Sequence, residues 1–363
     1  APGLSGKELD AYVAAGVYSD HECSDAADAM EKLRRGQVIM IREGTAARNL
    51  EALLPILKAP YADRCTFCSD DRHPSDILEE GHIDHICRKA IAGGADPILA
   101  VKAASWNAAQ YFKLHDRGAV APGYRADLAV IDNFENFKVE MTIQSGSVRY
   151  DGAVSDFPAP QLPAELGKRA VDTFHLGKLP PDDFRDARKR GVIGMIPGEI
   201  VTTDNGYADH VDVEADILKI AVVERHEHTG HVGIGYIQGY GLKAGAVATS
   251  ISHDSHNIIV VGTNSRDMAY AVNRVAENRG GIVVVKDEQV TAEVVLEIAG
   301  IMSDAPLEKI NEDLERAKEA ARAQGVSEGI DPFMTLSFMA LPVIPALRLT
   351  TRGVVDGLKQ QDV

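Results

Sequence analysis

The sequence predicts a mixed α/β fold in three parts joined by one linker. Strand-like and helix-like runs alternate from residue 1 to about 115, short runs broken by Gly, Pro and Asn fill 116–155, and a second region of helices and strands occupies 167–363. The segment between them, DFPAPQLPAEL at 156–166, carries three prolines and is typical of a linker.

The first region alternates strands with helices in a regular order. Strands are predicted at 17–20, 37–43 and 64–69, and helices at 5–15, 24–36, 45–58, 78–92 and 95–114. This alternation is typical of βαβ units with a parallel sheet. The strands are continuously apolar, as expected when both faces of a sheet are covered.

The later regions have a different texture. Alternating runs separated by turn residues in 116–155 predict a small antiparallel unit. In 167–363 the pattern is α+β, and two helices are predicted from apolar residues that recur on one face. These residues are Met268, Val272 and Val275 in the first helix, and Leu307, Ile310, Leu314, Ala317 and Ala321 in the second.

Composition excludes several classes of protein. The chain has 363 residues, 45% hydrophobic and 25% charged, which is ordinary for a globular protein. A net charge of −16 argues against nucleic acid as the main partner, because phosphate binding needs clustered Lys and Arg. No apolar run approaches the roughly 18 residues of a membrane span, and the first residues lack a signal-peptide pattern. Four cysteines form no disulfide framework, so we expect a cytoplasmic protein. The charge and the lack of a long apolar run predict no nucleic-acid and no membrane partner.

Polar side chains follow three successive strands of the first region. His21 follows the first strand, Arg42 and Glu43 end the second, and Asp70 and Asp71 follow the third. Because the carboxyl ends of parallel strands meet at one rim, these groups are expected close together. An imidazole and a carboxylate there suit a divalent metal that activates water, and a carboxylate can also relay the proton. The alternatives are an Asp that caps the next segment and an ion pair for Arg42 and Glu43.

The two adjacent aspartates are expected to differ in role. Adjacent residues of a strand point to opposite faces, so one carboxylate should face the site and the other the loop or Arg72. Nearby, the spacing Cys65-x-x-Cys68 with His82, His85 and Cys87 downstream offers a structural zinc site as an alternative. Two cysteines three positions apart in a strand fall on opposite faces, so buried free thiols are favoured.

Two histidine-rich segments of the last region are further candidates. The motif His226-Glu227-His228 has the spacing of a metal site on a strand, but an exposed polar strand end is favoured. The segment SHDSHN at 252–257 lies between two strand-like runs and is either a structural turn or a ligand-contacting loop. Its candidate ligand contacts are Ser252, His253, Asp254 and His256.

Several long motifs resemble the bacterial adenine deaminases of the amidohydrolase superfamily. They are PGLSGKELDAYVAAG, DHE, IMIREGTAARNLEALLP, CSDDRHP, EGHIDHICR, VKAASWNAAQYF, GAVAPGYRADLAVID, GYGLKAGAVATSISHDSHNIIVVG, GIMSD and LPVIPALRLT. The resemblance runs along essentially the whole chain and places it in the C-terminal part of such a protein.

The resemblance implies a fold, an activity and roles for particular residues. The fold is a (β/α)8 barrel of which 1–115 supplies strands 6 to 8, with a β-sandwich segment at 116–155 and an adenine deaminase C-terminal domain at 167–363. The activity is hydrolysis of adenine to hypoxanthine and ammonia in purine salvage, at a binuclear centre of manganese or iron in a homo-oligomer. It makes His21 a metal ligand and Asp70 a metal ligand and proton carrier. Asp71, Arg42 and Glu43 become candidates for contacts with the substrate, and SHDSHN would reach toward adenine.

The chain also departs from the family pattern. Members carry an H-x-H after strand 1, a bridging Glu after strand 4 and a His after strand 5, and none is present here. Three βα units cannot close an eight-stranded barrel, so the N-terminal half of the enzyme is expected to be missing. The alternatives are an inactive fragment, one half of a two-chain enzyme, or an amidohydrolase that acts on another cyclic amide or aminopurine.

Overall fold

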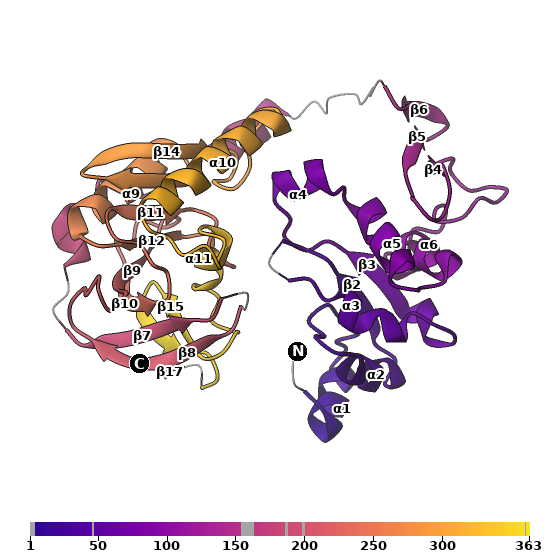
Figure 1. Ribbon diagram of the computed structural model, residues 1–363, viewed down its shortest axis with the longest axis horizontal. Coiled ribbons are helices and arrows are strands. Elements are labelled where there is room, and N and C mark those ends of the chain that lie inside the picture. The colour runs from indigo at the N-terminus through magenta and orange to yellow at the C-terminus, as the bar shows by residue number, and fades with distance from the viewer. Residues whose placement is uncertain (1–3, 46, 154–162, 186–187, 198–199, 360) are drawn as a thin grey trace. The chain divides into compact units, whose positions relative to one another are not determined.

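The computed structural model describes residues 4–45, 47–153, 163–185, 188–197, 200–359 and 361–363. The chain divides into two compact units, Ala1–Pro160 and Gln161–Val363, and each is described by itself (Figure 1). Most of the linker predicted at 156–166 lies outside the described residues. Its last part is the start of helix α8 (Ala164–Val171).

The first unit contains the predicted parallel sheet. Strands β1 (Ser19–Asp20), β2 (Val38–Arg42) and β3 (Cys65–Cys68) lie in the order β1-β2-β3, and both strand pairs are parallel. The helices around them are α1 (Gly6–Ala14), α2 (Ala26–Arg34), α3 (Leu50–Leu53), α4 (Pro74–Glu79), α5 (Ile83–Ala92), α6 (Pro97–Ala104) and α7 (Trp106–Tyr111). The βαβ order predicted from the sequence is therefore confirmed for this unit.

The helices of the first unit bury the apolar strands. Ile39 and Ile41 of β2 are fully buried in one cluster with Leu33 of α2 and Ile86 of α5. Helix α2 begins where the Asp25 carboxylate accepts hydrogen bonds from the backbone N–H groups of the first turn. Burial against helices explains why these strands lack the polar alternation of a half-exposed sheet.

A small antiparallel sheet ends the first unit. It contains β4 (Leu128–Ile131), β5 (Val139–Gln144) and β6 (Ser147–Tyr150) in sequence order. Ile131 and Phe137 pack against the core of the parallel sheet. The described residues of 116–155 thus form one three-stranded sheet, which is the antiparallel unit that the sequence predicts.

The second unit is built on an eight-stranded sheet with strand order β14-β13-β11-β12-β9-β10-β7-β8. All neighbours are antiparallel except β10 and β7. Its strands are β7 (Arg190–Met195), β8 (Thr202–Ala208), β9 (Ile217–Val223), β10 (Val232–Gln238), β11 (Ala246–Thr249), β12 (Ile258–Gly262), β13 (Gly281–Lys286) and β14 (Gln289–Val295). A smaller sheet contains β15 (Leu347–Thr350), β16 (Gly353–Asp356) and β17 (Gln361–Asp362).

Helices cover both faces of the large sheet. Helix α9 (Ser265–Glu277) packs on one face with Ala221, Val260 and Val283. Helices α10 (Leu307–Ala323) and α11 (Met334–Phe338) pack on the other face with Ile220, Val261 and Val284. Figure 1 shows α10 running beside β14. Alternate residues of each central strand therefore enter different cores, and the strand must be apolar throughout.

The two helices predicted in this unit are confirmed, with one adjustment. Met268, Val272 and Val275 of α9 are fully buried, as the spacing predicts. In α10, Leu314, Ala317 and Ala321 are buried while Leu307 is 39% exposed, so the first turn of the helix contributes little to the core. No helix in the described part of the chain is long and apolar enough to cross a membrane.

The core between α9 and the sheet should respond strongly to truncation of Met268. The substitution Met268→Ala is expected to lower the free energy of unfolding of the second unit by roughly 2–4 kcal/mol, since it leaves a cavity at a fully buried position. Urea denaturation at an unchanged m-value measures this loss. The matched control is Tyr270→Ala on the exposed side of the same helix, with a change within about 0.5 kcal/mol. Equal losses for both variants would contradict this packing.

Candidate functional site

The carboxyl ends of β1, β2 and β3 meet at one rim, and Arg42 lies at its centre. Its guanidinium donates to Glu22 Oε1 at 2.9 Å, to Glu22 Oε2 at 3.1 Å and to Asp70 Oδ2 at 2.7 Å. The side chain of Arg42 is only 7% exposed, against 32% for Asp70. One cation on the central strand thus joins acids that follow the two outer strands.

The predicted rim residue His21 has a partner that sequence reasoning did not select. His21 Nε2 lies 3.1 Å from Glu22 Oε1. This hydrogen bond lowers the pKa of Glu22 to about 2, against the opposing effect of burial and with support from Arg42. The same bond raises the pKa of His21, and the charge of Asp70 adds to the effect. Glu22 follows His21 directly in YSDHEC, so its position after the strand was the available signal.

The loops after β2 and β3 pass very close to one another. A Cβ atom at Gly44 would lie 2.7 Å from Ser69 O and 2.8 Å from Asp71 O, so only glycine fits there. The chain leaves β3 at Cys68, and Asp70 adopts a φ of 56°, a conformation in which Asp is enriched among non-glycine residues. The two aspartates therefore lie in a loop, and strand alternation does not separate them.

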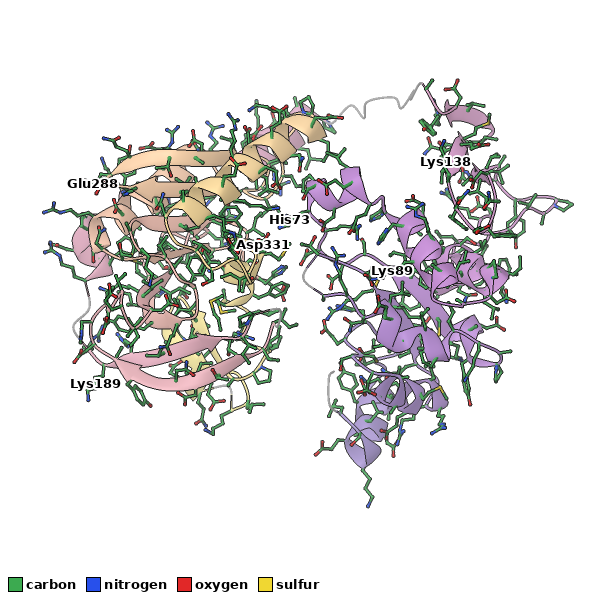
Figure 2. The ribbon with its side chains drawn as sticks, in the orientation of Figure 1. His73, Lys89, Lys138, Lys189, Glu288 and Asp331 are labelled. Atoms are coloured by element: carbon green, nitrogen blue, oxygen red, sulfur yellow. The ribbon has the colours of Figure 1, made fainter. Side chains whose placement is uncertain are left out.

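Asp70 and Asp71 nevertheless make different contacts. The Asp70 carboxylate pairs with Arg42, and the Asp71 carbonyl accepts the Thr45 N–H at 2.8 Å. His73, labelled in Figure 2, comes just before α4, and its backbone N–H donates to the Thr45 hydroxyl at 2.8 Å. Hydrogen bonds from the motif CSDDRHP thus connect the loop after β3 to the loop after β2.

Glu43 is fully buried in an ion pair beneath the rim. Its Oε1 accepts from Lys89 Nζ of α5 at 2.6 Å, and its Oε2 accepts from the Leu50 N–H at 3.3 Å. Although partial burial opposes it, the Glu43 carboxylate raises the pKa of Lys89, which is labelled in Figure 2. These contacts correspond to the ion-pair alternative that the sequence left open for Glu43.

A second buried cation supports the loop that carries His21. Lys32 of α2 has no exposed surface, and its Nζ lies 3.0 Å from Asp20 Oδ2 and 2.9 Å from Asp28 Oδ2. Asp20 Oδ1 accepts the Glu22 N–H at 2.6 Å. Helix α2 therefore fixes the turn that presents His21 and Glu22 at the rim. Sequence reasoning missed Lys32 because it occupies an interior helical position.

The donor set at the rim fits part of a metal centre. His21 and Asp70 are the predicted ligands, and the described residues contain no group of three or more His, Cys, Asp or Glu side chains placed to hold a metal ion. Each of the two also has a protein partner. A complete binuclear centre needs more ligands than the described residues bring to this rim.

The two alternative metal motifs take other forms. All four cysteines are free, Cys65 is fully buried, and burial raises the pKa values of Cys65 and Cys68 to about 12. The residues of His226-Glu227-His228 are exposed and lie beyond the end of β9. His226 Nε2 is 2.8 Å from Ser255 O, and the His228 ring stacks on His175. The structure agrees with the favoured interpretations, except that Cys65 is buried while Cys68 is only half-buried; the histidine motif is exposed beyond a strand end.

The SHDSHN segment forms the loop between β11 and β12. Ser252 is fully buried, the His253 ring stacks on Phe338 with centroids 4.7 Å apart, and His253 Nδ1 lies 3.2 Å from Asp254 Oδ1. The His256 N–H donates to Ser252 O at 2.6 Å. Asp254, one of the four residues predicted here as ligand contacts, lines a cavity together with Asn257.

Arg225 forms hydrogen bonds that fix the loop between β11 and β12. Arg225 is 2% exposed, and its guanidinium donates to the carbonyl oxygens of His256, Thr173 and Ala299. The guanidinium also lies 4.2 Å from the centre of the Phe174 ring. Burial lowers the pKa of Arg225 to about 10. Three segments that are distant in sequence therefore converge on one buried side chain.

Each of the two units is similar to a known protein family. Residues 5–149 match the amidohydrolase family, and residues 198–361 match the adenine deaminase C-terminal domain. The first unit is thus similar to the amidohydrolase family, in agreement with its parallel sheet and polar rim. The chain is therefore similar to adenine deaminases in its second unit and to amidohydrolases in its first.

The similarity to individual relatives runs through both units. Adenine deaminase 1 of Rhizobium meliloti is 44% identical and adenine deaminase 2 of Carboxydothermus hydrogenoformans 45% identical, each over 98% of this chain. The chain spans 64% of the length of each of these relatives. Among solved structures, a beta-aspartyl dipeptidase of Fervidobacterium islandicum is 24% identical and aligns over 36% of each chain with a TM-score of 0.31, which is too low to support an argument.

Removal of the Glu43 charge should destabilise the first unit. Glu43→Gln is expected to lower its free energy of unfolding by roughly 1–3 kcal/mol, since the substitution removes a buried, hydrogen-bonded charge opposite Lys89. Glu51 supplies a matched control because it contacts the same Lys89 Nζ at 3.4 Å but is 79% exposed. Glu51→Gln should change stability by less than about 0.5 kcal/mol. Denaturant unfolding followed by circular dichroism compares them, and a larger loss for Glu51→Gln would refute the assignment.

Proposed function

We propose that this chain is the larger part of an adenine deaminase, which hydrolyses adenine to hypoxanthine and ammonia. The observation that carries the proposal is identity of 44–45% with adenine deaminases across both units. The rim of the first unit supports it, because an imidazole and a carboxylate follow the two outer strands of one parallel sheet. The same proposal makes the enzyme a cytoplasmic homo-oligomer that acts in purine salvage.

The metal in this proposal is a binuclear centre of manganese or iron. Such a centre would supply a hydroxide nucleophile at neutral pH by lowering the pKa of bound water. In this chain His21 and Asp70 would hold it, and further ligands would come from the portion of the relatives that the chain does not span.

Asp70 is the proposed proton carrier. Its Oδ2 is held by Arg42, and no described residue forms a hydrogen bond or ion pair with its Oδ1. The oxygen that remains would accept the proton lost by water as the C6–O bond forms, and would return it to the amine as the C6–N bond breaks. Arg42 then acts by positioning, because it fixes the carboxylate at one oxygen and leaves the other for the reaction. Asp71 and Glu43 would support the rim through the loop contacts and the ion pair described above.

The proton role of Asp70 can be tested on the completed enzyme. When the chain is joined to the segment that completes its relatives, Asp70→Asn should reduce adenine turnover by about 10²–10⁴-fold, because an amide cannot accept the proton. Hypoxanthine and ammonia formation measure the rate. Asp63→Asn is the control, since Asp63 is 71% exposed and pairs only with Lys102 among the described residues. Near-normal turnover by Asp70→Asn would remove Asp70 from the proton path.

The chain alone should bind metal poorly. After incubation with manganese and desalting, we expect well below one ion for each chain by elemental analysis, because the described residues contain no group of three or more side chains placed to hold a metal ion. Two retained ions for each chain, lost together in His21→Ala, would show that the described rim already forms a complete centre.

A further inference from the structure

We propose that the second unit binds a single neutral heteroaromatic base, of the purine type, in the cavity beside the loop between β11 and β12. The cavity measures about 290 Å³ and lies wholly within the second unit. This volume is near the lower limit for small-molecule pockets in proteins, so it suits one base better than a nucleotide. The choice of a purine rests on the proposed function, whereas the choice of a planar polar ring rests on the lining.

The lining is apolar over most of its surface. Val222 of β9 and Leu349 of β15 are buried to 99% or more and contribute from the sheets, and Leu341 and Val343 contribute from the segment before β15. Val343 is 69% exposed. Apolar side chains from both sheets and a loop are the surroundings that the faces of an aromatic ring prefer.

One amide in the lining has a hydrogen-bonding group that pairs with no described residue. Asn257 is only 7% exposed, and its Oδ1 accepts the Arg225 N–H at 3.2 Å. This bond identifies which amide atom of Asn257 is the oxygen. The other atom is the Nδ2 group, which donates to no described residue. Asn257 lines the cavity, and its Nδ2 is not among the fully buried atoms without a partner, so a ligand or water in the cavity can accept from it. A ring nitrogen of a purine is such an acceptor.

A second polar group gives the cavity both kinds of hydrogen bond. The Asp254 side chain lines the same cavity and is 80% exposed, which places an acceptor where solvent still reaches it. An exocyclic amine could donate to this carboxylate while a ring nitrogen accepts from Asn257. The carboxylate disfavours an anionic ligand, and a lone exposed carboxylate is a weak site for a cation. A neutral ring with a donor and an acceptor on its edge satisfies both groups.

Binding of adenine to the intact metal-free chain tests this proposal. Isothermal titration should show one saturable site for each chain. Asn257→Asp retains the oxygen that accepts from Arg225 but removes the amide donor, so it should weaken adenine binding about tenfold while the fold is preserved. Val343→Trp should abolish binding by filling the cavity, and Val120→Trp, at a position 89% exposed in the first unit, is the matched control.

The outcomes separate this cavity from the proposed catalytic rim. Asp70→Asn should leave adenine binding by the chain unchanged even though it removes turnover by the completed enzyme. Loss of binding in Asp70→Asn with normal binding in both cavity variants would place the site at the rim and overturn the proposal. So would the absence of saturable binding by the folded chain, or binding of indole as tight as that of adenine, because indole has no ring nitrogen that accepts a hydrogen bond.

Discussion

The rim of the first unit depends on one buried guanidinium. Arg42 extends from the central strand of a three-stranded sheet, and its partners Glu22 and Asp70 follow the two outer strands. Two carboxylates near one another would repel, and the cation between them removes that cost. The remaining supports, Lys32 beneath the first loop and Gly44 beside the third, bring those acids within reach of Arg42. The position of His21 follows from the same arrangement, since it is adjacent to Glu22.

The edges of the parallel sheet and the incomplete donor set are related. Within the described residues, β1 and β3 each have β2 as their one neighbour, so both outer edges present unpaired backbone groups. The described residues likewise contain no group of three or more side chains placed to hold a metal ion. The chain spans 64% of the length of its relatives. Under the proposed function, the portion that it does not span would supply both further strands and further metal ligands to the first unit.

Much of the fold could be predicted from the sequence, but contacts between distant residues could not. The apolar runs at 37–43 and 64–69 and the spacing of Met268, Val272 and Val275 report directly on burial, so the strands and helix α9 were accessible. The roles of Glu22 and Asn257 depend on Arg42 and Arg225, which are 20 and 32 residues away. No local pattern encodes such a pairing. The exit of the chain from β3 before Asp70 was also hidden, because strand ends depend on the neighbouring loop.

In each unit a buried arginine forms a hydrogen bond with one atom of a polar side chain. The second polar atom of that side chain stays available for a ligand. In the first unit Arg42 holds Asp70 by Oδ2, and in the second the backbone N–H of Arg225 holds Asn257 by Oδ1. A carboxylate or amide held at one atom loses rotational freedom, and its second atom then points in a fixed direction. The second atom is Asp70 Oδ1 in one case and Asn257 Nδ2 in the other, an acceptor and a donor. Asp70 would meet the leaving amine of a base and Asn257 a ring nitrogen, and these would be two separate binding events. A variant at Asp70 should therefore change turnover, whereas a variant at Asn257 should change adenine binding by the second unit.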